Sequence, residues 1–175
     1  MHRIDPQEDG TFADLSRAGS SLLVIMSNPP LSTSGDRTRA RVRLLQEIVG
    51  IESVAMANLF SVPTYRTGEI SMVGSKEQGW LDARKDIRLG LVGCTAVLLA
   101  YGAQPPTGLA GVHFRSQLVW LRERVAARSL PVWMVSDRPL HPSRWHRHTF
   151  AHYPDIGFRE ALPMALRPWP VEEVG

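Results

Sequence analysis

The residues with the clearest chemical potential in this chain are one histidine and two asparagines. His141 precedes Pro142 and Ser143, Asn28 directly follows the apolar run SLLVIMS, and Asn58 lies within the run SVAMANLF. An imidazole can act as acid or base, or can donate a hydrogen bond to a developing negative charge. An amide can hold a water molecule, and its paired donor and acceptor match the edge of a nucleobase. These three side chains are therefore candidates for catalysis or for recognition of a base.

Each candidate also has a less specific interpretation, which the sequence leaves open. Asn28 precedes a proline and can form an Asx-turn that ends its strand. Asn58 can bridge neighbouring backbone groups, because a buried amide needs partners. His141 can be a surface residue of a polar loop. The sequence therefore supports both interpretations for each residue.

Residues 137–150, DRPLHPSRWHRHTF, look like a polar loop that is rich in histidine and arginine and contains a tryptophan. Arg144 and Arg147 suit contact with phosphate, and Trp145 between them suits stacking on a base, although a solvated charged loop is an alternative. A metal cluster is a weaker possibility, since no pattern such as H-E-x-x-H is present. Its candidate ligands are His141, His146, His148 and His152. We expect no metal and no cofactor.

The elements that must position these residues follow from the hydrophobic pattern. Apolar runs predict four buried strands, and the segments between them predict three helices. The strands are expected over residues 21–27, 53–60, 94–103 and 130–136, and the helices over 37–50, 80–93 and 108–129. Residues 70–79 are poorly patterned and are expected to form a loop. This alternation predicts a three-layer α/β/α domain with a four-stranded parallel sheet.

Ligands of an open parallel sheet bind outside the carboxyl ends of its strands, so the residues that follow each strand belong together. Asn28 and His141 are the candidate catalytic residues. The candidate base-binding or substrate-binding residues are Ser27, Pro29, Asn58, Tyr65, Gly102 and Ser143. The candidate phosphate-binding residues are Arg37, Arg41, Arg66 and Arg144.

Composition narrows the class of protein. The chain has 175 residues and a net charge of +3, and 18 of its 20 basic residues are arginine. A GC-rich genome explains this bias, but arginine also suits phosphate binding. We expect one domain, residues 1–175, with loosely packed segments at 1–20 and 160–175. The single cysteine, Cys94, excludes an internal disulfide.

Several familiar classes lack support in the sequence. There is no P-loop, no G-x-G-x-x-G after a strand and no G-x-S-x-G elbow. The N-terminus has no apolar stretch typical of a signal peptide, and no run approaches the ~18 apolar residues of a membrane span. We therefore expect a cytoplasmic protein without a membrane partner.

Five segments occur in the order typical of a bacterial and phage family called domain of unknown function 1643, which this chain resembles from Leu22 to Trp145. They are LLVIMSNPP, MANLFSVPTYR, VGSKEQGWL, AVLLAYGA and RPLHPSRW. That family has a strand ending in Asn-Pro, an NLF strand followed by an arginine, and a late His-Pro. The chain differs in having NPPLSTSGD, where members more often have NPS followed by alanine and aspartate.

A more distant resemblance is to the uracil-DNA glycosylase superfamily, whose sheet has four parallel strands flanked by helices. Residues 28–32, NPPLS, are similar to the Asn-Pro-Gly-Leu-Ser motif that positions the attacking water in the mismatch-specific branch. The resemblance implies that Asn58 reads the base, that His141-Pro142-Ser143 stabilises the departing base, and that Arg144 or Trp145 wedges into a helix. It implies architecture more directly than activity.

Three hypotheses for function remain. The first is a nucleobase-recognising protein of uracil-DNA-glycosylase-like fold that hydrolyses an N-glycosidic bond in DNA or a nucleotide. The second is a non-catalytic binder of nucleic acid or nucleotide on the same fold, which the lack of an acidic residue at the end of the first strand favours. The third is an enzyme acting on a nucleoside or another small metabolite. The sequence does not decide whether the protein is an enzyme.

Overall fold

A five-stranded sheet forms the centre of the computed structural model, which describes residues 15, 19–31 and 34–169. The strands are β1 (Ser21–Met26), β2 (Ser53–Asn58), β3 (Ala96–Leu99), β4 (Val132–Val135) and β5 (Leu166–Pro168). Their order across the sheet is β2-β1-β3-β4-β5. The first four strands are parallel, and β5 pairs antiparallel with β4. The sheet is therefore mostly parallel.

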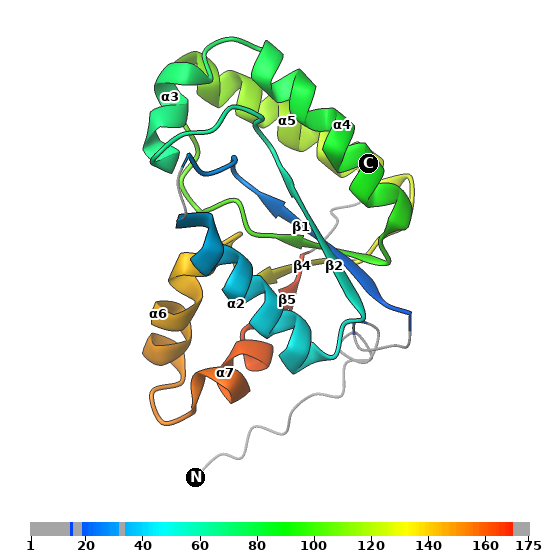
Figure 1. Cartoon of the computed structure of the whole chain (residues 1–175), viewed down its shortest axis with the longest axis vertical. Helices are drawn as coiled ribbons and strands as arrows, with labels where there is room; N and C mark the ends of the chain where they lie inside the picture. Colours follow the sequence, from blue (N-terminus) through cyan, green and yellow to red (C-terminus); the bar gives the residue numbers. More distant parts are fainter. Residues whose placement is uncertain (1–14, 16–18, 32–33, 170–175) are drawn as a thin grey trace.

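Helices lie on both sides of the sheet. They are α2 (Ser34–Val49), α3 (Ile70–Val73), α4 (Gln78–Gly93), α5 (Gly108–Ala126), α6 (Pro142–His152) and α7 (Phe158–Met164), and a 3-10 turn η1 spans Thr67–Glu69. In Figure 1, α2, α6 and α7 lie on one side and α4 and α5 on the other. This arrangement is consistent with a three-layer α/β fold. No described helix is both long and apolar enough to cross a membrane.

Alternate side chains of each central strand point into two separate cores. Val24 of β1 packs in the core under α2, α6 and α7, together with Leu45. Ile25, the next residue, packs in the core under α4 and α5, together with Ile87. Because both faces of the sheet are covered, the central strands are apolar along their whole length rather than alternating.

Each of the four predicted strands contains a parallel strand of the sheet, although the observed strands are shorter, and the sheet has a fifth strand that was not predicted. The fifth strand has only three residues, and one of them is Pro168, so it carries no recognisable strand pattern. Proline is tolerated there because β5 is an edge strand. The predicted loose packing of residues 160–175 is also wrong as far as residue 169, since Ala161 and Leu162 are fully buried. Residues 170–175 lie outside the described part of the chain, as does most of 1–20.

Residues 70–79 do not form the expected loop. They comprise α3, a short turn and the start of α4. Trp80 organises the segment, because its indole Nε1 donates to the carbonyl oxygen of Gly74 at 2.8 Å and its ring lies against Phe60. A side chain at Gly79 would collide with the ring of Phe60. Tertiary packing rather than hydrophobic periodicity therefore determines this segment.

The polar segment after β4 is a helix, α6, and not the expected loop. Pro142 occupies its first turn, where proline is favoured, and His141 is the N-cap residue. Trp145 is 0% exposed and packs in the core under α6 and α7, so it is not placed to stack on a base or to act as a wedge. Arg144, Arg147 and the histidines after His141 therefore lie along one helix, whereas Arg138 lies in the turn before it.

Candidate functional site

The carboxyl edge of the parallel strands is hollowed by two cavities. β1 and β3 are neighbours in the sheet, and the chain continues from β1 into α2 on one face and from β3 into α5 on the other. A change of face of this kind is where open α/β sheets leave a crevice for ligands. His141 and Ser143 line both cavities and so form the rim that they share.

The first hollow, which we call the arginine cavity, has a volume of about 670 Å³ and lies between the ends of β1 and β2 and the start of α2. Its basic side chains are Arg37, Arg39, Arg41 and Arg66. Asn28, Asn58 and His141 also line it, together with Pro29 and Tyr65. The two asparagines and the histidine, which are far apart in sequence, thus meet at one cavity.

The amide of Asn28 connects the loop after β1 to the loop after β2. Its Nδ2 donates to Thr64 Oγ1 at 2.7 Å and to the Val62 carbonyl at 3.4 Å, and also to the neighbouring Pro29 carbonyl. The hydroxyl of Thr64 donates in turn to the carbonyl of Arg66 at 2.9 Å. These bonds orient the amide, and its Oδ1 accepts no hydrogen bond from another described residue.

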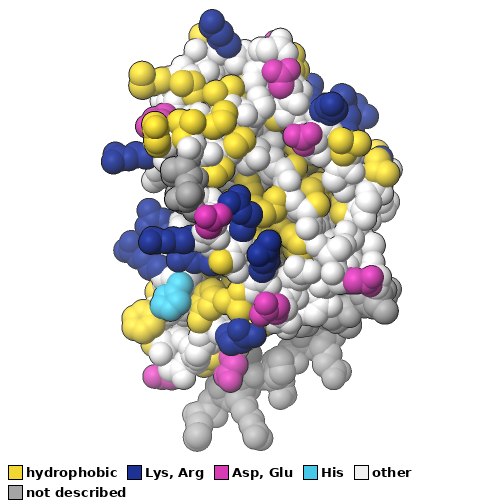
Figure 2. Space-filling model, in the orientation of Figure 1, with side chains coloured by type: hydrophobic (Ala, Val, Ile, Leu, Met, Phe, Trp, Pro, Cys, Tyr) yellow, Lys and Arg dark blue, Asp and Glu magenta, His cyan; other side chains and the backbone are white. Residues whose placement is uncertain are grey.

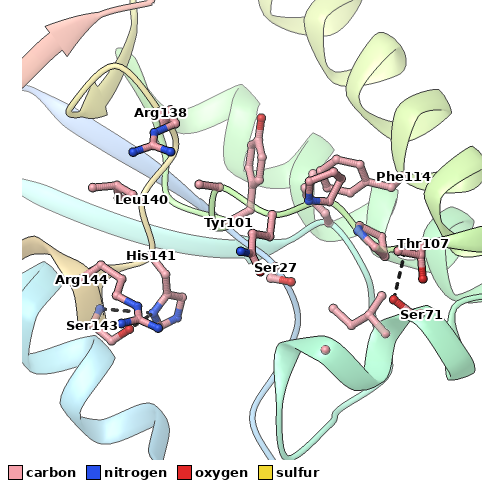
Figure 3. Close-up of a pocket in the computed structure, with 18 of the residues that line it drawn as sticks. Ser27, Ser71, Tyr101, Thr107, Phe114, Arg138, Leu140, His141, Ser143 and Arg144 are labelled. Carbon is pink, nitrogen blue, oxygen red and sulfur yellow. Dashed lines mark hydrogen bonds between the residues drawn. The ribbon is translucent and has the colours of Figure 1, made fainter.

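The second hollow, the aromatic cavity, has a volume of about 780 Å³. Part of its wall is a chain of edge-to-face rings, in which Phe114 lies 5.7 Å from Tyr101 and 6.1 Å from Trp80 between ring centroids. In Figure 3, Phe114, Thr107 and Ser71 lie on one side of the hollow and His141 and Arg144 on the other. Ser27, at the end of β1, lies between them. An aromatic wall facing basic side chains suits a planar ligand that carries negative charge.

The predicted site residues divide between the two cavities. Ser27, Gly102 and Arg144 line the aromatic cavity, and Ser143 lines both. His141 also lines both, and the remaining predicted residues line the arginine cavity; they are Asn28, Pro29, Asn58, Tyr65, Arg37, Arg41 and Arg66. Sequence reasoning missed the aromatic wall, because Trp80 and Phe114 come from two helices. Only the packing of Phe114 between Tyr101 and Trp80 brings these rings together.

Gln117 was also missed, and it fixes the position of the aromatic wall. It is completely buried within α5, and its Nε2 donates to the carbonyls of Leu59 at 3.0 Å and Trp80 at 2.9 Å. Its Oε1 accepts from Arg84 Nε at 2.9 Å. The sequence does indicate such a role, because a glutamine on the inward side of a helix needs buried hydrogen-bond partners. This residue therefore ties α4 and α5 to the end of β2.

Both cavities are strongly basic. Arg138, Arg144 and Arg147 line the aromatic cavity, in addition to the four arginines of the arginine cavity, and no carboxylate is among the described residues that line either one. Arg39 pairs with Asp36, and Arg138 lies 3.6 Å from Asp137. Figure 2 shows Lys and Arg side chains gathered around the start of α2 and beside α6. This electrostatic environment attracts anions.

His141 is held as a hydrogen-bond donor. Its Nδ1 accepts from the backbone N–H of Ser143 at 3.2 Å and lies 2.9 Å from Ser143 Oγ, so the proton of the neutral ring belongs on Nε2. Burial lowers the pKa of His141, and the positive charges of Arg41 and Arg144 lower it further. The ring is therefore neutral at pH 7, and its Nε2–H donates to no described residue.

We expect an NMR titration of the His141 ring to show a pKa below the ordinary 6.5 and a proton on Nε2. Arg144→Gln should raise this pKa because it removes one of the nearby charges, whereas Arg147→Gln, one turn further along α6, should leave it close to the wild-type value. Because the pKa of His141 is lower in the folded protein than in the unfolded chain, the group contributes stability above pH 6.5 that is lost as the pH falls. A His141 pKa above 6.5 would contradict the assignment.

The histidines of α6 do not converge. His148 stacks on His152, with ring centroids 4.1 Å apart, while His146 lies 5.3 Å from the ring of Phe158. Within residues 19–31 and 34–169 no group of three His, Cys, Asp or Glu side chains has a geometry that could hold a metal ion. The helix thus directs its histidines to different surroundings.

Comparison of the chain with protein-family models, with curated proteins and with solved structures gave no match. The resemblances to domain of unknown function 1643 and to the uracil-DNA glycosylase superfamily stay predictions. The function therefore has to be argued from the cavities themselves.

Proposed function

We propose that this protein recognises a nucleobase joined to a phosphate, in nucleic acid or in a nucleotide, at the carboxyl edge of its parallel sheet. The observation that carries the proposal is the lining of the two cavities, which contains many arginines and no described carboxylate. Arginine offers a planar fork that matches phosphate oxygens. Asp36 and Asp137 partly neutralise Arg39 and Arg138, but the other arginines of the two linings favour a ligand with negative charge.

The neutral polar groups support a base as the other part of the ligand. Asn58 is partly buried at the end of β2 and lines the arginine cavity with Tyr65, a residue that is 73% exposed. An amide can pair with the edge of a base, and an exposed ring can stack on its face. A uracil-DNA-glycosylase-like fold is part of this proposal, since four parallel strands covered by helices agree with what that resemblance implies.

Hydrolysis of the N-glycosidic bond is a second candidate, favoured by Asn28 and His141 lining one cavity. Water held by Asn28 Oδ1 would attack the anomeric carbon, and the bond from that carbon to the base nitrogen would break. The electron pair leaves with the base, the Nε2–H of His141 stabilises its negative charge, and the proton of water passes to solvent or to the base. An amide is a weak activator of water, so binding is the first proposal.

Binding and hydrolysis can be tested on the same protein. We expect single-stranded oligonucleotides to bind with an affinity that falls with salt, with a slope of about 0.7 per neutralised phosphate. Uracil-, hypoxanthine- and mismatch-containing oligonucleotides then test for base release, with Asn28→Ala and His141→Ala as controls. Salt-dependent binding without release supports recognition alone. Absence of binding to any oligonucleotide or nucleotide refutes the proposal.

A further inference from the structure

The arginine cavity and the aromatic cavity are both large enough to hold a ligand of their own. Their volumes, about 670 and 780 Å³, each fall within the range of roughly 300–1,000 Å³ typical of small-molecule sites. A single nucleotide does not need both. The structure therefore raises the question of what occupies the second cavity when the first is filled.

Each cavity offers its own surface for a planar group. The aromatic cavity has the partly exposed rings of Tyr101 and Phe114, and the buried ring of Trp80 packs against Phe114. The arginine cavity has the exposed ring of Tyr65 and the amide of Asn58. Base–aromatic stacking tolerates any base, because every base has a π-face. Two bases can thus be held separately, one on each side of the shared rim.

The rim between the cavities suits a negatively charged connection. His141 and Ser143 line both hollows, and His141 presents a neutral Nε2–H. Arg41 approaches the rim from the arginine cavity and Arg144 from the aromatic cavity. Both arginines are near enough to His141 to lower its pKa, so a group that crosses the rim at His141 is close to positive charge from both cavities. A phosphodiester has the charge and the acceptor oxygens for this position.

Positive charge also continues outward from both cavities. Arg37 and Arg66 are exposed at the arginine cavity, and Arg138 and Arg147 are exposed at the aromatic cavity. A compact dinucleotide joined by a pyrophosphate places its charge only at the centre. A nucleic-acid strand carries further phosphates beyond each base, which matches the outward arginines.

We propose that the ligand is a single nucleic-acid strand, with two successive bases in the two cavities and the phosphodiester between them over His141 and Ser143. This inference rests on the proposed function and names its substrate class. In this arrangement one base lies in the arginine cavity, and the base of the next nucleotide lies against the aromatic wall.

Calorimetric titration of the full chain tests the proposal with four probes: dTMP, the dinucleotide pdTpdT, the tetranucleotide (pdT)4, and diadenosine diphosphate, in which a pyrophosphate joins two nucleosides. We expect pdTpdT to bind at least about tenfold more tightly than dTMP, which corresponds to about 1.4 kcal/mol. The tetranucleotide should bind at least as tightly as pdTpdT. Equal affinity for dTMP and pdTpdT overturns the two-cavity proposal but leaves nucleotide recognition intact, whereas no binding of any probe overturns both. Diadenosine diphosphate that binds as tightly as (pdT)4 also overturns the proposal that the ligand is a strand.

Variants on each side of the rim complete the test. Tyr65→Ala and Phe114→Leu should each reduce the affinity for pdTpdT to about that for dTMP in the wild type. The side chain of Tyr65 is exposed, so its replacement should not affect folding. Val112→Ala, at an exposed position on the same helix as Phe114, is the control and should leave both affinities unchanged. The assignment of one base to each cavity is overturned if Val112→Ala no longer binds pdTpdT more tightly than dTMP. It is also overturned if both ring variants still bind pdTpdT more tightly than dTMP.

Discussion

Replacing Arg41 by glutamine is expected to weaken binding of a single-stranded oligonucleotide about ten- to a hundredfold, whereas Arg43→Gln leaves it unchanged. Arg41 is partly buried, lines the arginine cavity and contributes to the lowered pKa of His141. A hydrogen bond to a charged group contributes about 1.5–3 kcal/mol, and each 1.4 kcal/mol changes a binding constant tenfold. Calorimetric titration at low salt measures the effect.

Arg43 is a matched control because it lies on the same helix but is turned away from the cavity. Two residues correspond to roughly 200° around an α-helix, and Arg43 is exposed and is not among the residues that line either cavity. Arg41→Lys should fall between the wild type and Arg41→Gln, since lysine keeps the charge but lacks the planar fork. If Arg41→Gln and Arg43→Gln lose the same amount of oligonucleotide affinity, binding depends only on the overall positive charge of the surface. That result would contradict a specific site at the arginine cavity.

The predicted meeting of Asn28, Asn58 and His141 depends on one inference that sequence supports well. Apolar runs such as SLLVIM locate strands buried on both faces, and parallel strands bring their carboxyl ends to one edge. Residues that follow different strands must then be close in space, whatever their separation in the chain. This reasoning needs only the strand positions and their direction.

Two cavities instead of one could not be predicted from that reasoning. The division depends on where His141 and Ser143 stand between the hollows, and therefore on the packing of α6 against the sheet. The aromatic wall depends likewise on Phe114 and Trp80, which two different helices contribute and the buried amide of Gln117 helps to position. Such contacts arise only from tertiary structure.

The sequence of α6 does contain a helical pattern, but the polar composition of the segment favoured the prediction of a loop. Pro142, Trp145 and Thr149 are buried at steps of three and four residues, which is the spacing of one helical face. The proline directly after His141 is typical of the first helical position. The histidines and arginines on the other faces suggested a loop. The pattern of the buried side chains was therefore more informative than the number of charged ones.

Trp145→Ala should lower the free energy of unfolding by about 3–5 kcal/mol, which is a large part of the roughly 5–15 kcal/mol typical of a domain. The side chain is 0% exposed and lies in the core under α6 and α7 with Val135 and Leu162. Truncation removes this packing and leaves a cavity. Urea unfolding followed by circular dichroism measures the loss. Phe150→Ala, on the same helix at a residue that is 66% exposed, should change stability by less than about 0.5 kcal/mol.

Trp145→Phe separates packing from hydrogen bonding and links the core to the site. The indole Nε1 donates to the carbonyl of Leu140 at 2.9 Å, directly before His141. Phenylalanine keeps most of the apolar volume but leaves that carbonyl without its partner, which costs about 1–3 kcal/mol. Because Leu140 and His141 both line the aromatic cavity, oligonucleotide binding should weaken while the protein stays folded. If Trp145→Phe binds like the wild type, this hydrogen bond does not position the rim, and α6 holds His141 through its backbone alone.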